Sequence, residues 1–255
     1  MSKDLDFALS LADSADEIAL SRFRALDLKV DTKPDRTPVT DADTAVEERL
    51  RSLISNFSPA DAVIGEEFGA QTGTREWIID PIDGTVNFLR GISIWASLIA
   101  LRVNGELKLS VVSAPALGRR WWAEKGSGAH TRDIDGSERT LGVSKVAKLE
   151  DSFVSFNSIS QWDSIGRAER LTELSRKVFR DRAFGDFLSY MYVAEGIIEM
   201  AAEPDLKLHD IAALVPIVTE AGGRFTALDG ELDDDTSAVI ASNGLLHDQF
   251  REILA

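Results

Sequence analysis

The stretch that decides the fold is residues 77–88, which read Trp77-Ile78-Ile79-Asp80-Pro81-Ile82-Asp83-Gly84-Thr85-Val86-Asn87-Phe88. The apolar run from Trp77 to Ile79 predicts a short buried strand. The run ends at two carboxylates three residues apart, Asp80 and Asp83, and then at a glycine that permits a tight turn. Paired carboxylates suit a hard cation such as Mg²⁺, and the free amides of a turn suit phosphate. The stretch therefore predicts metal-assisted phosphate chemistry.

Composition narrows the class of protein. The chain has 255 residues, enough for one large domain or two small ones that share a core. It has no cysteine, which excludes disulfides and thiolate metal sites and fits a reducing cytoplasm. Its net charge of −15 disfavours binding to nucleic acid, and no apolar run is long enough for a signal core or a membrane span. We expect a cytoplasmic protein with a small-molecule partner, acting on neither nucleic acid nor a membrane.

Hydrophobic periodicity divides the chain near residue 145. The first half predicts two amphipathic helices, a polar loop between them at 33–38, and then short strands separated by glycine turns up to residue 131. The second half alternates strands and helices and has no disordered spacer before it. The expected strands are 153–156, 197–202 and 238–241, and the expected helices are 168–179, 187–195, 210–221 and 245–254. We expect two halves packed into one unit.

Acidic residues stand at the ends of four predicted elements. Each alone has a structural explanation as a helix cap or a solvated turn. Four acidic groups at the ends of elements, one of them inside the stretch 77–88, instead favour a shared cation site. The acids are Asp41 with Asp43, Glu66 with Glu67, Asp80 with Asp83, and Asp210.

Four stretches, in this order, resemble the inositol monophosphatase family of Mg²⁺-dependent, lithium-sensitive phosphatases. They are Thr37–Asp43, Gly65–Glu67, Trp77–Phe88, and His209–Ala213 with Glu220–Gly223. The similarity covers nearly the whole chain, and the Asp-Pro-Ile-Asp-Gly-Thr match is highly specific. The resemblance implies an α/β (α+β) fold, a five-layered αβαβα sandwich. Residues 1–145 would carry an antiparallel sheet and the main metal site, and 146–255 a mixed sheet and the substrate-selecting residues. It also implies a homodimer.

The resemblance further implies a metal cage for two or three Mg²⁺ ions. Asp80 would bridge two ions, and a third, weaker ion would lie near Glu66. The implied ligands are the side chains of Glu66, Asp80, Asp83 and Asp210 and the carbonyl of Ile82.

Catalytic and phosphate-binding roles follow from the same resemblance. Thr85 would help Glu66 to orient and deprotonate the attacking water, and Asp43 would hydrogen-bond to Thr85. The backbone of Asp83, Gly84 and Thr85 would hold the phosphate at a helix start. Lys33 lies near the mobile-loop lysine of the family.

The three histidines receive different expectations. We expect His130 and His247 at the surface, in a turn and in a helix. His209 stands where the family usually has a tryptophan, and it would either shape the wall of the site or pack there. We favour packing.

The alcohol of the substrate should meet the second half of the chain. Asp186 follows Gly185. At the position of Asp186, inositol-type members usually carry a small or uncharged residue. Glu203 stands seven residues before Asp210, where the family places a substrate-contacting glutamate. These four residues form the expected substrate site, and two acids in an alcohol pocket suggest a positively charged substrate.

Residues 185–190, Gly-Asp-Phe-Leu-Ser-Tyr, resemble the histidinol-phosphate phosphatase branch of the family, especially its actinobacterial members. The ammonium or the imidazole of L-histidinol phosphate would pair with Asp186. The structural alternative is that Asp186 caps the helix expected at 187–195. We predict a histidinol-phosphatase of histidine biosynthesis.

Two alternatives stay open. The first is an inositol-1-phosphate phosphatase or a broad-specificity phosphomonoesterase, against which Asp186 argues. The second is a non-catalytic protein of the same fold that acts in transcription or RNA processing. The complete set of acids, Thr85 and the acidic charge balance argue against the second.

Overall fold

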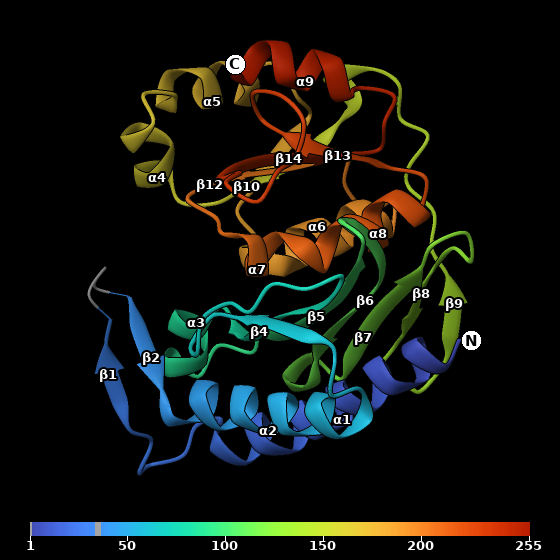
Figure 1. Cartoon of the computed structure of the whole chain (residues 1–255). Helices are drawn as coiled ribbons and strands as arrows, with labels where there is room; N and C mark the ends of the chain where they lie inside the picture. Colours follow the sequence, from blue (N-terminus) through green and yellow to red (C-terminus); the bar gives the residue numbers. More distant parts are fainter. Residues whose placement is uncertain (1, 34–36) are drawn as a thin grey trace.

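The structure is a computed structural model that describes residues 2–33 and 37–255. Helices and sheets alternate in five layers, seen edge-on in Figure 1. Two long helices lie below a seven-stranded sheet, a central layer of helices follows, and a five-stranded sheet lies under the last helices. The predicted αβαβα sandwich is therefore confirmed. Residues 34–36 of the expected polar loop lie outside the described residues.

The seven-stranded sheet holds the strands of the first half in chain order. Neighbouring strands are antiparallel except β3 and β4, which are parallel because the connection 66–74 returns the chain to the same end of the sheet. The strands from β4 to β9 are thus antiparallel, and only the added edge strand β3 is parallel to its neighbour. The strands are β3 Ala62–Gly65, β4 Arg75–Asp83, β5 Ala96–Val103, β6 Glu106–Ala114, β7 Arg119–Glu124, β8 Ala129–Arg132 and β9 Glu138–Thr140.

The five-stranded sheet belongs to the second half and is mixed, as predicted. Its order is β11-β10-β12-β14-β13, with parallel pairs on both sides of β10 and antiparallel pairs elsewhere. The sequence pattern missed β11 and β13, which are short and begin with an arginine. The strands are β10 Phe153–Phe156, β11 Arg180–Arg182, β12 Met200–Pro204, β13 Arg224–Ala227 and β14 Ala238–Ser242.

Helices form the other three layers. The expected helix 210–221 is instead two helices, because Pro216 has no N–H to donate to the carbonyl of Ala212. The pattern also missed α3 and α4, which are single short turns. The helices are α1 Lys3–Arg22, α2 Asp41–Phe57, α3 Thr85–Arg90, α4 Ile159–Ser164, α5 Ala168–Ser175, α6 Asp186–Ala194, α7 Leu208–Ala212, α8 Leu214–Glu220 and α9 His247–Leu254. Smaller elements are the strands β1 Val30–Thr32 and β2 Pro38–Thr40 and the 3₁₀ turns Pro115–Leu117 and Leu149–Asp151.

The two halves share a core. One apolar cluster joins α1 and α2 to the outer face of the seven-stranded sheet. A second fills the space between the two sheets, where α8 packs against β6 and β7. Because this second cluster draws residues from both halves, the halves are packed into one unit, whereas the division at residue 145 stays a prediction. No helix in the described part of the chain is long and apolar enough to cross a membrane.

The expectation for His247 is wrong, since its side chain is fully buried. Its Nδ1 lies 2.8 Å from the Ser242 hydroxyl and its Nε2 lies 3.0 Å from the Thr226 hydroxyl. Thr226 donates its own proton to the carbonyl of Ala227, so a neutral His247 with its proton on Nε2 satisfies the network. His130 lies in β8 rather than in a turn, and it is partly exposed.

We expect His247 to make stability fall in mild acid. Burial lowers the pKa of His247 to about 4, helped by Arg224 and Arg251 and opposed by Asp248. A lowered histidine pKa means that the unfolded chain binds the proton more readily, so stability is lost as the pH falls below about 6.5. The cost reaches about 2 kcal/mol at pH 5. Urea unfolding at pH 7 and pH 5 should show this difference between the wild type and His247→Gln; an equal pH dependence in both would contradict it.

Candidate active site

A bulge in β4 brings the first two acids to one place. Residues three apart on a regular strand point to opposite faces of the sheet. The pairing with β5 shifts between Asp80 and Asp83, which face Leu98 and Ala96, so three steps on β4 match two on β5. Ser97 fixes the bulge by donating a 2.7 Å hydrogen bond to the Pro81 carbonyl. The extra residue turns both carboxylates toward the same pocket.

The turn after β4 requires a glycine. Gly84 precedes α3 with a φ of 82°, in the left-handed region that glycine adopts without strain. A Cβ at this position would lie 3.0 Å from the Ile94 carbonyl oxygen and 3.3 Å from the Asp186 carboxylate. The first amides of α3 have no side-chain cap, and Gly84 and Thr85 both line the pocket. This backbone is where the sequence predicts phosphate binding.

Asp43 serves the helix and the site at once. One of its oxygens, Oδ2, accepts a 2.9 Å hydrogen bond from the Thr40 amide and completes the capping box of α2. The other, Oδ1, accepts from the Thr85 hydroxyl at 3.3 Å, the contact that the sequence predicts. The Ile82 carbonyl lies 3.1 Å from the same hydroxyl. Because the Thr85 hydroxyl donates its hydrogen bond to one of these acceptors, the lone pairs of its oxygen can accept a hydrogen bond from a group in the pocket.

Glu66 enters the site from the loop after β3. Lys33 donates 2.7 Å hydrogen bonds to both Glu66 and Glu67, and all three side chains are largely buried. Burial alone would lower the pKa of Lys33, but the bonds to the two glutamates outweigh it and raise this pKa. A Lys33 ammonium therefore neutralises part of the acidic charge near Glu66.

The loop that carries Glu66 is held from below by Glu47. This α2 residue is completely buried, and its carboxylate accepts hydrogen bonds from the amides of Glu67 at 2.7 Å and Phe68 at 3.2 Å. Arg51 pairs with it at 2.8 Å. Gly65 is obligatory here, because a Cβ would lie 2.0 Å from a Glu47 oxygen. Glu47 thus positions Glu66 through the backbone.

We expect Glu47→Gln to weaken Mg²⁺ binding. The amide would turn an N–H toward backbone donors, so the loop that carries Glu66 would lose its fixed position. Groups behind the ligands of a metal affect affinity by about 10–100-fold, and we expect about tenfold here. Calorimetric titration with Mg²⁺ measures this change in affinity. The neighbouring exposed residue gives the control, Glu48→Gln, which should bind as the wild type does; equal affinities in both variants would contradict the role of Glu47.

Asp210 comes from the second half of the chain. It lies in the first turn of α7, where its Oδ2 accepts a 2.6 Å hydrogen bond from the Lys207 amide. Oxygens of Asp80, Asp83 and Asp210 lie within 4.8 Å of one another. The capping interaction thus orients the residue, and its carboxylate joins the two acids of β4.

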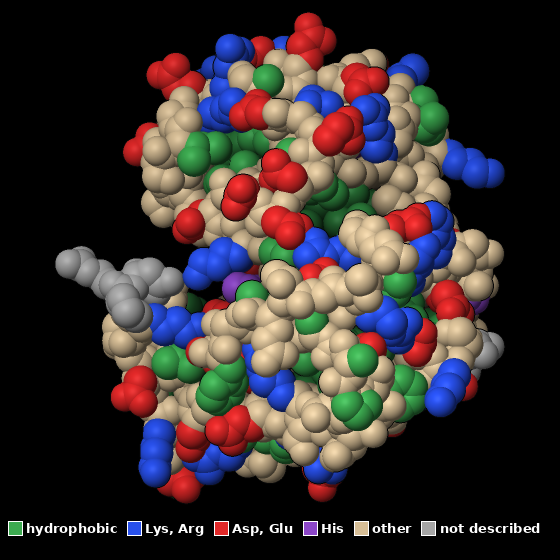
Figure 2. Space-filling view, in the orientation of Figure 1, with side chains coloured by type: hydrophobic (Ala, Val, Ile, Leu, Met, Phe, Trp, Pro, Cys, Tyr) green, Lys and Arg blue, Asp and Glu red, His purple; other side chains and the backbone are tan. Residues whose placement is uncertain are grey.

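Most of the predicted site residues line one pocket of about 220 Å³. Figure 2 shows the surface hollowed between the lower and upper parts of the molecule, with Asp and Glu side chains along the upper rim. Of the predicted site residues, Gly185, Glu203 and the buried Asp43 are not among the pocket's lining. The lining includes Glu66, Asp80, Ile82, Asp83, Gly84, Thr85, Asn87, Asp186 and Asp210.

The electrostatics of the pocket favour a divalent cation. Burial raises the pKa of Asp80 far above its usual range, and repulsion from Glu66, Asp83 and Asp210 adds to this. Asp80 is 2 % exposed, and its Oδ1 has no hydrogen-bond partner among the described residues. A cation would relieve both the repulsion and the missing contact. Asp80, Asp83 and Asp210 offer hard carboxylate oxygens, which suit Mg²⁺, so these residues fit the predicted ion.

Asp186 does not cap its own helix. The N-terminus of α6 is capped from another element, because Asp83 accepts a 2.9 Å hydrogen bond from the Phe187 amide. Asp186 has a φ of 48° and accepts a 2.6 Å hydrogen bond from the Asn87 side chain. Burial raises its pKa to about 6, against the effect of Asn87, so the carboxylate is still largely ionised at neutral pH. The structural alternative of a cap is therefore wrong.

Glu203 lies behind the pocket on β12. It is 7 % exposed, and it accepts hydrogen bonds from the Asn157 side chain and, at 3.5 Å, from the Tyr190 hydroxyl. Burial, followed by repulsion from Asp186 and Asp210, raises its pKa to about 8. The hydrogen bonds from Asn157 and Tyr190 oppose this rise and favour the ionised form.

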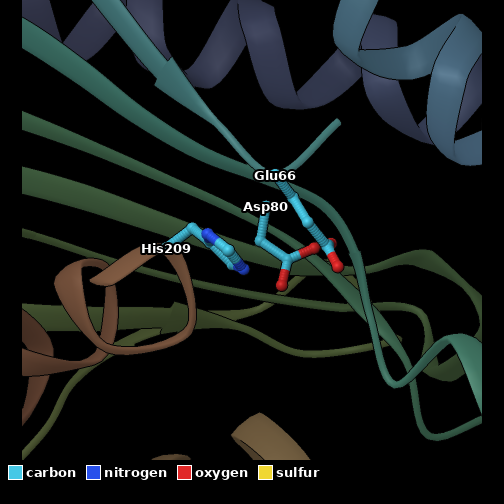
Figure 3. A group of neighbouring side chains, drawn as sticks. All are labelled: Glu66, Asp80 and His209. Atoms are coloured by element: carbon cyan, nitrogen blue, oxygen red, sulfur yellow. The ribbon is translucent and has the colours of Figure 1, made fainter. Parts of the chain in front are cut away.

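His209 lies beside the acids of the site. It projects from α7, and Figure 3 shows its imidazole edge turned toward the carboxylates of Glu66 and Asp80. One nitrogen and one oxygen from each carboxylate lie within 4.8 Å of one another. The expectation for His209, that it shapes the wall of the site or packs there, stays a prediction.

Three polar residues in the site were not singled out from the sequence. Asn87 lies inside the quoted stretch and donates to Asp186. Asn157 directly follows β10 and donates to Glu203. Glu47 could have been found from the sequence, because it shares the buried face of α2 with Val46 and Leu50. An acid on an apolar face requires a partner.

Comparison with known proteins agrees with the geometry. A model of the inositol monophosphatase family matches residues 1–255. The histidinol-phosphatase of Mycobacterium tuberculosis is 53% identical over 249 residues, which cover 96% of this chain and 95% of that protein. The histidinol-phosphatase of Streptomyces coelicolor is 51% identical over 251 residues, covering 96% and 94%.

Solved structures give the same fold. An IMPase of Thermotoga maritima superposes with a TM-score of 0.89 at 31% identity, over 99% of this chain and 97% of that one. The extragenic suppressor protein suhB of Bartonella henselae gives 0.90 at 28% identity, over 99% and 98%. The predicted resemblance is confirmed, and the chain belongs to the inositol monophosphatase family.

Proposed function

We propose that this protein is a Mg²⁺-dependent phosphomonoesterase that hydrolyses L-histidinol phosphate to L-histidinol and phosphate in histidine biosynthesis. The observation that carries the substrate is the position of Asp186, a carboxylate that lines the same pocket as the metal-site acids and accepts a hydrogen bond from Asn87. Two relatives more than 50% identical over almost the whole chain bear the name histidinol-phosphatase, which supports the same substrate.

The metal cage would hold two or three ions between the halves of the molecule. When bound, Mg²⁺ screens the phosphate dianion and lowers the pKa of the attacking water. The proposed ligands are the side chains of Glu66, Asp80, Asp83 and Asp210 and the carbonyl of Ile82.

Glu66 and Thr85 would handle the water. The Thr85 hydroxyl donates its hydrogen bond to Asp43 or to the Ile82 carbonyl, so its oxygen can accept a hydrogen bond from the water and orient it. Glu66 takes up the proton as the new bond to phosphorus forms. The ester bond then breaks, and the leaving alkoxide takes a proton from a solvent water to become the alcohol. Glu66 returns its own proton to the solvent, so the enzyme is unchanged at the end of the reaction. The backbone of Asp83, Gly84 and Thr85 would hold the phosphate.

The alcohol would lie toward α6. Asp186 pairs with the ammonium or the imidazolium of the substrate, and Asn87 holds the carboxylate in place. A positive charge near Glu203 would lower its raised pKa and ionise it, so that Glu203 contributes only when such a substrate is bound. Gly185, with a φ of 89°, places Asp186 at the start of the helix.

Phosphate release with and without Mg²⁺ tests the reaction class. We expect release from L-histidinol phosphate with Mg²⁺ and none with a chelator present. Activity that persists in the chelator would reject the metal mechanism. A folded sample that releases no phosphate from any ester would instead favour a binding protein of the same fold.

The remaining proposals rest on the family resemblance. We infer a homodimer, which light scattering tests, and a cytoplasmic location. The net charge of −15 supports a small-molecule partner rather than nucleic acid.

A further inference from the structure

The imidazole of His209 lies between two groups of carboxylates. One of its nitrogens forms a cluster with oxygens of Glu66 and Asp80, all within 4.8 Å of one another. Its Nε2 lies 3.7 Å from Oδ1 of Asp210, which in turn belongs to the cluster with Asp80 and Asp83. In Figure 3 the ring extends from α7 toward the carboxylates of Asp80, on β4, and of Glu66, in the loop after β3. A nitrogen donor therefore faces a cage that otherwise offers only oxygens.

A second observation concerns the hydrogen bonding of Asp80. Asp80 is only 2 % exposed, yet its Oδ1 has no hydrogen-bond partner among the residues that the structure describes. The His209 side chain is itself only 11% exposed. A buried carboxylate oxygen without a donor is costly, and a cation between Asp80, Glu66 and His209 would satisfy it.

We propose that His209 is a metal ligand, and that its nitrogen makes the ion position beside Glu66 and Asp80 selective for first-row transition cations such as Mn²⁺ and Zn²⁺. Oxygen ligands suit Mg²⁺, whereas an imidazole ligand binds transition cations more strongly. Glu66 would reach this ion while Lys33 keeps its bond to Oε1, since the carboxylate has a second oxygen. The inference extends the proposed metal mechanism but depends on no particular substrate.

Mn²⁺ bound to the full-length protein is the probe. The protein is prepared without a polyhistidine tag, and pulsed electron paramagnetic resonance detects a nitrogen-14 nucleus bonded directly to Mn²⁺. His209→Gln removes the imidazole but keeps a polar side chain of similar length. His130→Gln is the matched control, because His130 lies in β8, stacked on Trp122 and bonded to Ser127.

We expect a nitrogen-14 signal in the wild type and in His130→Gln, and no signal in His209→Gln. Calorimetry should show Mn²⁺ binding to this position at least about tenfold weaker in His209→Gln, with a smaller change for Mg²⁺. No nitrogen signal in the wild type, or an equal signal in His209→Gln, would overturn the inference. Circular dichroism of each variant establishes that it is folded.

The outcome is separable from that of the proposed function. A wild-type protein that hydrolyses the ester with Mg²⁺ but shows no nitrogen ligand overturns only the role of His209. A nitrogen ligand in a protein that hydrolyses no phosphate ester overturns only the proposed function.

Discussion

Asp80→Asn should abolish hydrolysis while making the metal-free protein more stable. Asp80 is buried and lies in both candidate metal clusters, so its loss removes the central ligand of the cage. We expect turnover to fall by about 10²–10³-fold, the scale reached when a principal electrostatic group is removed. Stability should rise without metal, because the substitution ends the repulsion that Glu66, Asp83 and Asp210 exert on Asp80.

Urea unfolding with and without Mg²⁺ measures the second effect. Mg²⁺ at about 100 times its dissociation constant should stabilise the wild type by about 2.7 kcal/mol. Asp80→Asn should gain far less and should start from a higher metal-free stability. A metal-free variant that is less stable than the wild type would show that Asp80 has a structural role, contrary to the proposed cage.

Asp186→Asn should separate charged from neutral substrates. A hydrogen bond to a charged group is worth about 1.5–3 kcal/mol, so kcat/KM for L-histidinol phosphate should fall by about 10–100-fold. Hydrolysis of inositol 1-phosphate, which has no positive charge in its alcohol, should change little. Asparagine is well suited to the test, since it tolerates the φ of 48° and can still accept the hydrogen bond from Asn87.

Steady-state kinetics with both esters gives the answer. Equal losses on the two substrates would mean that Asp186 acts by holding the start of α6 in place. A loss confined to the neutral ester would contradict the proposed pairing altogether.

The sequence predicted the parts of the site that depend on local pattern. The apolar run, the proline and the glycine of 77–88 predict a strand that ends in a turn, and the structure has β4 and α3 there. It could not show that a bulge at Pro81 aligns Asp80 with Asp83, because that shift depends on pairing with β5.

Long-range contacts account for the other differences. His247 is polar and stands at a helix start, which favours the surface, yet Ser242 and Thr226 from neighbouring strands enclose it. Asp186 had the position of a cap, but Asp83, far away in the chain, caps α6 instead. Neither arrangement is encoded in the periodicity of one segment. The first depends on how β13 and β14 pack against α9, and the second depends on how the two halves meet.

The ratio of kcat/KM for L-histidinol phosphate to that for inositol 1-phosphate, measured with the wild type at saturating Mg²⁺, tests the central claim most directly. The ionised Asp186 beside the metal-site acids predicts a ratio of at least about 10. A ratio below one, with inositol 1-phosphate as the better substrate, would contradict the assignment.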